Sequence, residues 1–418
     1  MHAMTITEKI LASHAGVDLV RPGEMVQVKV DLALANDITA PLAINVFNEL
    51  GVKTVYDRHK VALVQDHFVP NKDIPSAEQA KVMKEFALEH RVTHYFDLGD
   101  SGIEHVILPE KGLVVPGDVV IGADSHTCTY GALGAFSAGV GSTDLGVIMA
   151  TGTVWLKVPE TIKLVYDGML GPWVGGKDLI LFTLGLIGNQ VYKTLEFSGP
   201  LMPHLSMSDR LTMANMAVEA GAKSGIFEPD EITKKYLENR TEREGVYFFS
   251  DPNAGYERIV PINVDDMEPQ IACPSNPNNV HPISQVERVA LDQVFIGSCT
   301  NGRLEDLQIA ADLLKGKSVC RGVRLIVIPG SPAVYKEAIK RGIIETLLDS
   351  GAVIGPPTCG PCLGGHMGVL ARGEKALSTS NRNFVGRMGH AESEVYLASP
   401  AVAAASAVFG RIAGPSEL

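Results

Sequence analysis

The stretch Pro356-Pro357-Thr358-Cys359-Gly360-Pro361-Cys362-Leu363-Gly364-Gly365 places a Cys-x-x-Cys pair on a loop rich in glycine and proline. A third cysteine lies upstream, on the glycine-flanked loop Gly297-Ser298-Cys299-Thr300-Asn301-Gly302. Three thiols on tight loops suit a soft metal ion or an iron-sulfur cluster. Structural zinc sites and most clusters take four protein ligands, so three cysteines on a cluster would leave one iron with an open position. An open metal position provides a Lewis acid.

The same cysteines allow three other interpretations. A Cys-x-x-Cys pair is typical of redox proteins, and a histidine could complete a zinc site. The three thiols could also be small buried side chains with no ligand. Spacing alone leaves these alternatives open.

Composition limits the class of protein. The chain has 418 residues, 36 basic and 48 acidic side chains, and a formal net charge of -12. This acidic balance, with scattered basic residues, argues against a nucleic-acid partner. Six cysteines are too few for a disulfide scaffold. The sequence shows neither a signal-peptide pattern nor an apolar run long enough to cross a membrane, so we expect a cytoplasmic protein with reduced thiols.

Apolar runs alternate with helical segments along the chain, which predicts parallel sheets covered by helices. Helices are expected after a capping box at Thr5 to Glu8, and at residues 39–51, 76–90, 208–220, 230–243 and 333–341. A strand is expected at residues 26–34, where apolar residues alternate. The glycines of residues 131–152 lack a nucleotide-binding fingerprint, and we interpret them as positions of close packing.

Reactive side chains follow several predicted strands at the point where each strand ends. Asp66 and His67 follow residues 61–64, Asp124 and His126 follow residues 119–121, and the cysteine loops follow residues 294–296 and 352–354. Parallel sheets bind ligands outside the carboxyl ends of their strands. If the sheets face one another, these side chains can line one cleft.

Two further features are ambiguous from sequence. Glu219 lies near the end of a predicted helix, where a carboxylate disfavours the helix dipole, and an exposed charge is the simpler interpretation. Asn381-Arg382-Asn383-Phe384-Val385-Gly386-Arg387 carries two arginines suited to carboxylate recognition, although they could equally be surface charges.

Four motifs in this order resemble the aconitase superfamily over essentially the whole chain. They are Asp124-Ser125-His126-Thr127, Gly297-Ser298-Cys299-Thr300-Asn301, Cys359-Gly360-Pro361-Cys362, and residues 381–387. The resemblance implies an α/β fold of three doubly wound α/β/α domains around a central iron-sulfur cleft. We place these domains at residues 1–160, 161–280 and 281–418.

The resemblance also implies a cofactor and a reaction. One 4Fe-4S cluster would be held by Cys299, Cys359 and Cys362. The chain would be a hydro-lyase that dehydrates a small hydroxy di- or tricarboxylate and rehydrates it with the hydroxyl moved by one carbon. The closest likeness is to dehydratases of amino-acid biosynthesis.

The family's functional residues map onto matching positions of this chain. Asp66 and His67 match the pair that protonates the leaving hydroxide. The other positions implied as catalytic are His105, Asp124, His126 and Glu219. The positions implied as substrate-binding are Asn36, Ser125, Asn381, Arg382 and Arg387.

One departure from the family pattern concerns a partner. Full-length aconitases carry a C-terminal swivel domain that supplies the base for the substrate's proton. This chain lacks matching sequence, so we expect a separate small subunit that carries the swivel domain, and no activity without it. We expect that subunit to make most of the choice between substrates. An RNA-binding role, known in one relative, is disfavoured by the acidic charge, and an iron-sulfur or zinc protein without hydro-lyase activity stays open.

Overall fold

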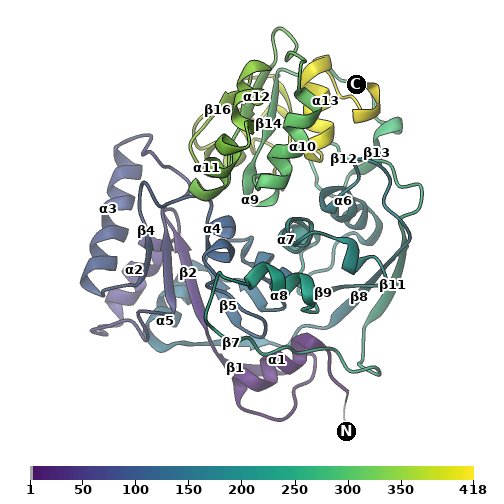
Figure 1. Cartoon of the computed structure of the whole chain (residues 1–418). Helices are drawn as coiled ribbons and strands as arrows, with labels where there is room; N and C mark the ends of the chain where they lie inside the picture. The colour runs from purple at the N-terminus through teal and green to yellow at the C-terminus, as the bar shows by residue number, and fades with distance from the viewer. Residues whose placement is uncertain (1–2) are drawn as a thin grey trace.

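The computed structural model describes residues 3–418 and contains three sheets of mainly parallel strands (Figure 1). The strands are β1 (Met25–Lys29), β2 (Leu32–Asn36), β3 (Val61–Val64), β4 (His94–Phe96), β5 (Val119–Gly122), β6 (Phe136–Gly139), β7 (Thr153–Lys157), β8 (Thr161–Asp167), β9 (Thr194–Ser198), β10 (Ser224–Phe227), β11 (Arg258–Asn263), β12 (Gln270–Ala272), β13 (Val280–Pro282), β14 (Gln293–Ile296), β15 (Arg324–Val327), β16 (Val353–Ile354), β17 (Lys375–Ser378) and β18 (Glu394–Leu397).

Helices connect and cover these strands. The α-helices are α1 (Ile6–Ala15), α2 (Ala40–Glu49), α3 (Ile74–Glu89), α4 (Glu104–Glu110), α5 (Ser142–Thr151), α6 (Gly176–Ile187), α7 (Met207–Met216), α8 (Glu231–Leu237), α9 (Ser298–Asn301), α10 (Leu304–Leu314), α11 (Pro332–Lys340), α12 (Ile343–Asp349) and α13 (Pro400–Phe409). Three 3-10 helices matter for the site, namely η1 (Thr127–Leu133), η3 (Ala217–Ala220) and η5 (Gly360–Leu363).

The first sheet has five parallel strands in the order β4-β3-β2-β5-β6. The second has four parallel strands, β10-β9-β8-β11, and the third has seven, β13-β12-β18-β17-β14-β15-β16. In the described part of the third sheet, β12 pairs in antiparallel fashion with both β13 and β18, and the other pairs are parallel. The predicted α/β class is therefore confirmed.

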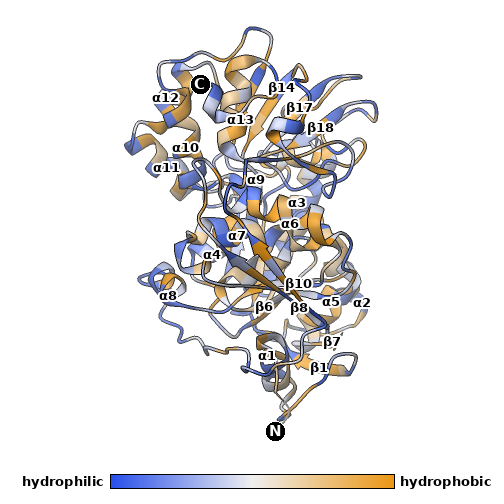
Figure 2. Ribbon diagram, turned by 90° about the vertical axis from the view of Figure 1, so that its right-hand side faces the viewer, coloured by the Kyte–Doolittle hydropathy of each residue, from blue (hydrophilic) through white to orange (hydrophobic). Residues whose placement is uncertain are grey.

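Burial explains why these strands form parallel sheets. Every residue of β2, β3, β5 and β14 is buried, as expected for strands covered on both faces. In Figure 2 the strands of the second sheet, near the labels β8 and β10, contain both hydrophobic and hydrophilic residues. One apolar cluster joins residues of all three sheets, including Val64, Leu164 and Phe295, so their cores are continuous.

The strands of the three sheets fall at residues 32–139, 161–263 and 270–397. β12 joins the third sheet although it precedes residue 280. The division at residues 160 and 280 stays a prediction.

The single strand predicted at residues 26–34 is wrong, because the chain breaks at Asp31. β1 pairs with β7 in a separate two-stranded ribbon, whereas β2 enters the first sheet. The Asp31 carboxylate accepts the backbone N–H of Val119 at 3.0 Å and contacts His14 and Lys60. This half-buried polar hub lies where the chain turns between the two strands.

One helix prediction needs correction, and a second is confirmed with a change of helix type near its end. The solvated helix expected at residues 230–243 ends at Leu237, and Arg243 instead binds Asp118 through a bidentate ion pair. The helix expected at residues 208–220 tightens into η3 after Met216 and ends at Gly221, whose φ of 77° is left-handed.

The close packing expected in the glycine-rich segment is confirmed. A Cβ atom on Gly146 would lie 2.6 Å from the carbonyl oxygen of Ala43, where α5 packs on α2. A Cβ atom on Gly131 would collide with the backbone of Gly225. None of the helices in residues 3–418 combines the length and apolarity that a membrane crossing needs.

Candidate active site

The sequence-predicted site residues converge on a cavity of about 230 Å³ that is lined by residues from the first-sheet and third-sheet parts of the chain. All of them except Glu219 line it. The lining residues are Asn36, Ile38, Thr39, Asp66, His67, Ile103, Glu104, His105, Ala123, Asp124, Ser125, His126, Cys299, Cys359, Cys362, Leu363, Asn381, Arg382 and Arg387. Carboxyl ends of strands in the first and third sheets supply most of these positions, as the strand-end pattern predicts.

The three predicted thiol ligands lie together in this cavity. Cys299 is the second residue of α9, which follows β14, and Cys359 and Cys362 flank the start of η5 after β16. All three side chains are buried. Cys128, in contrast, bonds to the carbonyl of Asn215 at 3.3 Å and does not line the cavity.

Hydrogen-bond donors surround the sulfur atoms. Asn381 Nδ2 donates to Cys299 Sγ at 3.2 Å and to Asn215 Oδ1 at 3.1 Å. Ser298 Oγ and an Arg387 guanidinium nitrogen each lie 3.7 Å from Cys362 Sγ. Donors aimed at sulfur fit a thiolate-bound metal group, because they stabilise negative charge that remains on the ligands.

Burial and neighbouring groups shift the pKa values of the three cysteine thiols. Burial raises the pKa of Cys299 to about 12. The hydrogen bond between Cys359 and Cys362 raises the pKa of Cys359 and lowers that of Cys362, and Arg387 lowers the latter further. Thiols held neutral by burial become thiolates when a metal cation binds them. The donor set therefore fits a metal cluster with three cysteine ligands.

Asp66 and His67 form a buried pair at the end of β3. His67 Nδ1 is hydrogen-bonded to Asp66 Oδ1, and Asp37 Oδ1 lies 3.5 Å from the same nitrogen. Asp37 also accepts the backbone N–H groups of His67 and Phe68, both at 2.9 Å. Burial lowers the pKa of His67, but the two carboxylates outweigh it and the net pKa is raised well above 6.5. This geometry favours a protonated imidazole.

A second histidine pair lies across the cavity floor. His105 Nε2 is 2.7 Å from Asp124 Oδ1, and Tyr130 Oη is 2.9 Å from His105 Nδ1. Asp124 Oδ1 also accepts the backbone N–H of His126 at 2.6 Å. Burial raises the pKa of Asp124, yet the hydrogen bond and charge of His105 outweigh it, so the pKa is lowered.

The exposed-charge interpretation of Glu219 is wrong. Its side chain is only 2% exposed, and Oε1 lies 2.8 Å from both His126 Nε2 and Arg382 Nε. Burial raises the pKa of Glu219, but these two partners outweigh it and lower the pKa. Glu219 thus holds a histidine and an arginine that both line the cavity, without lining it itself.

Asn36 lines the cavity, but its amide is already engaged. Oδ1 accepts the backbone N–H groups of Ile38 and Thr39, each at 3.1 Å. Nδ2 donates to Glu104 Oε1 at 3.0 Å. Its role as a substrate contact stays a prediction.

Sequence reasoning missed several residues around the cavity. Asp37 follows β2 as Asp66 follows β3, so its strand-end position was a usable signal. Glu104 precedes His105, but no sequence pattern marks it as a residue of the site. Lys177 lies within an apolar helix, and its buried ammonium donates to the carbonyls of Thr379 and Ser380 at 2.6 and 2.7 Å. Burial lowers the pKa of Lys177 to about 7.

Residues 8–410 match the Aconitase family (aconitate hydratase). The chain is also similar to proteins named 3-isopropylmalate dehydratase large subunit. It is 60% identical over 417 residues to that of Syntrophus aciditrophicus and 61% identical over 417 residues to that of Moorella thermoacetica, with 99% of each chain covered. It is 58% identical over 422 residues to 3-isopropylmalate dehydratase large subunit 1 of Pyrococcus furiosus, with 100% of both chains covered.

Proposed function

The chain belongs to the aconitase family, and from that premise we propose that it is the large subunit of a 3-isopropylmalate dehydratase. It is then a hydro-lyase of leucine biosynthesis, which interconverts 2-isopropylmalate and 3-isopropylmalate through 2-isopropylmaleate. Relatives with this name match at about 60% identity over the full chain. The observation that carries the proposal is one cavity lined by three thiols, two histidine-carboxylate pairs and two arginines.

Membership of the family implies a 4Fe-4S cluster. We assign its protein ligands as Cys299, Cys359 and Cys362, one cluster per chain. When bound, the cluster supplies an open iron that acts as a Lewis acid toward the substrate's hydroxyl and carboxylate. The sulfur-directed donors Asn381, Ser298 and Arg387 support this assignment.

His67 is the proposed proton donor to the departing hydroxyl. Asp66 and Asp37 engage Nδ1, which orients the ring and keeps it protonated, and leaves Nε2 for the substrate. Hydroxide is a poor leaving group, so protonation at a positioned acid lowers the barrier. The His105-Asp124 and His126-Glu219 pairs are placed to handle further protons and to fix the remaining polar groups of the site.

Arg382 and Arg387 are the proposed carboxylate-binding residues. Arg387 Nε is buried and lacks a hydrogen-bond partner among residues 3–418. A substrate carboxylate would satisfy it through a charge-assisted hydrogen bond. Arg382 is held by Glu219, which fixes its orientation at the cavity wall. Ser125 and Asn381 line the same cavity.

The relatives are named large subunits, which implies a small subunit as partner. We propose that this partner carries the swivel domain and supplies the base that removes the substrate's proton. A neighbouring cavity of about 840 Å³ shares Asp124, Ser125 and Arg382 with the candidate site. Its wall includes Trp155 and Val191, which are 61% and 66% exposed. An apolar rim continuous with an incomplete site is a suitable docking place for that subunit.

Related substrates give the alternative functions. A homoaconitase large subunit is the first, and hydratases of dimethylmalate or maleate type follow. We expect the small subunit to make much of this choice. The reducing cytoplasm is the proposed location, and all six cysteines are unpaired as thiols in the structure.

Anaerobic reconstitution with iron and sulfide tests the proposal. We expect about four irons and four sulfides per chain, and an EPR spectrum of the reduced cluster that shifts when 3-isopropylmalate and the small subunit are added. Tightly bound zinc without sulfide would refute the cluster. A cluster that responds to homocitrate but not to 3-isopropylmalate would favour the alternative.

A further inference from the structure

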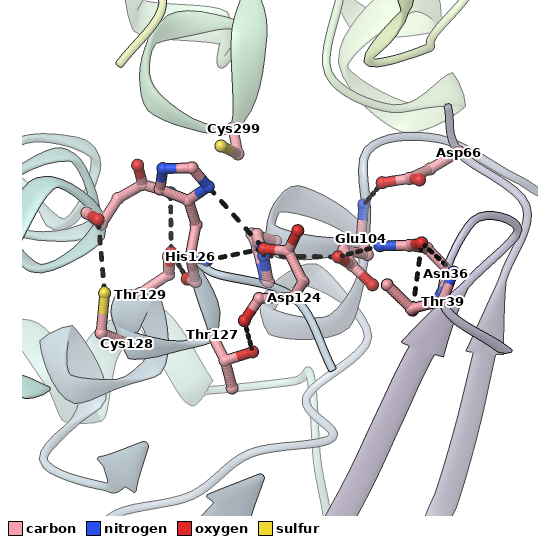
Figure 3. Close-up of polar contacts among 12 residues, drawn as sticks. Asn36, Thr39, Asp66, Glu104, Asp124, His126, Thr127, Cys128, Thr129 and Cys299 are labelled. Atoms are coloured by element: carbon pink, nitrogen blue, oxygen red, sulfur yellow. Dashed lines mark hydrogen bonds and ion pairs between the residues drawn. The ribbon is translucent and has the colours of Figure 1, made fainter. Parts of the chain in front are cut away.

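Glu104 is a buried acid that none of the proposed roles uses. It opens α4, its residue is 1% exposed, and Figure 3 shows it between Asn36 and Asp124. Oε1 accepts the Asn36 amide at 3.0 Å and lies 3.4 Å from His105 Nε2. Its backbone N–H donates to Asp66 Oδ2 at 3.1 Å. Glu104 therefore touches both histidine-carboxylate pairs of the site.

Within residues 3–418, each cationic side chain that faces Glu104 is already paired with another carboxylate. The charged groups that face it are Asp66 and His67 from the loop after β3, Asp124 from the loop after β5, and His105 from its own helix. His67 is engaged by Asp66, and His105 lies closer to Asp124, at 2.7 Å. A charged Glu104 would be a third carboxylate beside two others, which is unfavourable in a buried site.

The hydrogen bonds of Asn36 fix which Glu104 oxygen carries the proton. Asn36 Oδ1 accepts two backbone N–H groups, so its Nδ2 must face Glu104 and the Oε1 it contacts must accept. Oε2 is buried and has no hydrogen-bond partner among residues 3–418. A neutral hydroxyl at that position costs less than an unsolvated charge. Burial, Asp66 and Asp124 all raise the pKa of Glu104 well above its ordinary value.

We propose that Glu104 is held as a neutral carboxylic acid and acts as a positioning residue whose side chain fixes the Asn36 amide beside the His105-Asp124 pair. Its protonation state stands independently of the reaction, whereas its effect on turnover rests on the proposed dehydratase function. A negative charge here would stabilise the imidazolium of His67 and weaken it as an acid. The neutral form accepts the hydrogen bond from Asn36 without stabilising the imidazolium of His67.

Infrared difference spectroscopy on the full-length chain with ¹³C-labelled glutamate tests the protonation state. Subtracting the spectrum of Glu104→Gln from that of the parent at pH 7 is expected to show the loss of one labelled carboxylic-acid C=O band. Glu110→Gln is the matched control, because Glu110 ends the same helix and burial also raises its pKa. It does not line the cavity. A labelled carboxylate band lost in Glu104→Gln would overturn the proposal.

Activity of the reconstituted holoenzyme with its small subunit tests the positioning role. Glu104→Gln should keep kcat within about threefold of the parent and leave the alkaline limb of the pH profile in place, since it preserves the neutral acceptor. Glu104→Ala should lower kcat/KM by about tenfold, because the Asn36 amide loses its partner. Equal, complete inactivation of both variants with an intact cluster would show a chemical rather than a positioning role. If the parent itself lacks hydro-lyase activity, the proposed function fails while the infrared result still decides the state of Glu104.

Discussion

The backbone N–H of Cys359 donates a hydrogen bond to the carbonyl oxygen of Asp66 at 2.8 Å. The hydroxyl of Thr358 donates to the same oxygen at 2.8 Å. The Cys-x-x-Cys loop of the third sheet is thus fastened to the residue that holds His67 in the first sheet. These hydrogen bonds couple the position of this loop to that of the proposed proton donor.

Cys362→Ser is expected to abolish cluster-dependent turnover, because a neutral hydroxyl is a poor replacement for a thiolate ligand. Cys320→Ser is the control, since Cys320 is partly exposed and lies outside the cavity, and it should leave activity nearly intact. Iron and sulfide counts and turnover are the measurements. Loss of activity in both variants would contradict the ligand assignment.

Asp37→Asn is expected to shift the alkaline limb of the pH profile to lower pH. The Asp37 carboxylate helps to raise the pKa of His67, so its removal lets the acid lose its proton earlier. The stabilisation from the protonated His67 is fully present below the unfolded pKa of 6.5 and is lost as pH rises through the raised folded pKa. Initial rates and thermal unfolding between neutral and alkaline pH measure both effects. An unchanged limb would remove Asp37 from this role.

Glu219→Ala is expected to lower the free energy of unfolding by about 3 kcal/mol, because it leaves the buried His126 and the partly buried Arg382 without their shared partner. Glu231→Ala is the matched control, as that side chain is 91% exposed. Its effect should stay below about 0.5 kcal/mol. Urea denaturation of the two apo variants provides the comparison, and equal stabilities would argue against the buried network.

Lys177→Met is expected to speed iron loss from the reconstituted protein by about tenfold or more. Without the ammonium, the Ser380 carbonyl loses its donor and the segment that carries Asn381 loosens beside Cys299. Lys234→Met, at a position 69% exposed, serves as the control. Release of iron to a chelator can be followed by absorbance. Equal release rates would show that the segment is held by its other contacts.

Trp155→Glu is expected to weaken binding of the small subunit by at least about tenfold, because a charge would replace an aromatic side chain at the proposed docking rim. Leu348→Glu is the control, on α12 and far from β7 in Figure 1. Its exposed fraction of 53% is similar to that of Trp155. Affinity can be measured by titration of the labelled small subunit. Unaltered affinity for Trp155→Glu would place the partner elsewhere.

The strand-end pattern was enough to predict that Asp66 and Asp124 lie together, because parallel strands place their carboxyl ends at one edge of a sheet. Cys299 follows a strand of the third sheet, so its place in the same cavity also required the sheets to face one another, which the sequence could not establish. Periodicity could not reveal the break at Asp31, since the polar hub that causes it comes from residues distant in sequence. Apolar alternation continues through that break, so the two strands look like one.

Pairings across the chain were beyond the reach of sequence patterns. In the sequence Glu219 looks like an exposed charge, because its partner Arg382 lies 163 residues away. Lys177 and Glu104 are similar cases, because each is buried against residues distant in sequence. Local propensity contains no information about such partners.

The bond between Thr358 and Asp66 spans 292 residues of chain. During synthesis, the amino-terminal sheet with its proton-donor pair leaves the ribosome long before the Cys-x-x-Cys loop exists. Domains generally fold in the order in which they emerge. The cavity is therefore incomplete, with the polar residues of the first sheet open to water, until the Cys-x-x-Cys loop has been synthesised. With Cys359 and Cys362 as the proposed ligands, cofactor insertion is expected to follow synthesis of this loop, and a chain truncated before Cys359 would lack two of the three proposed ligands.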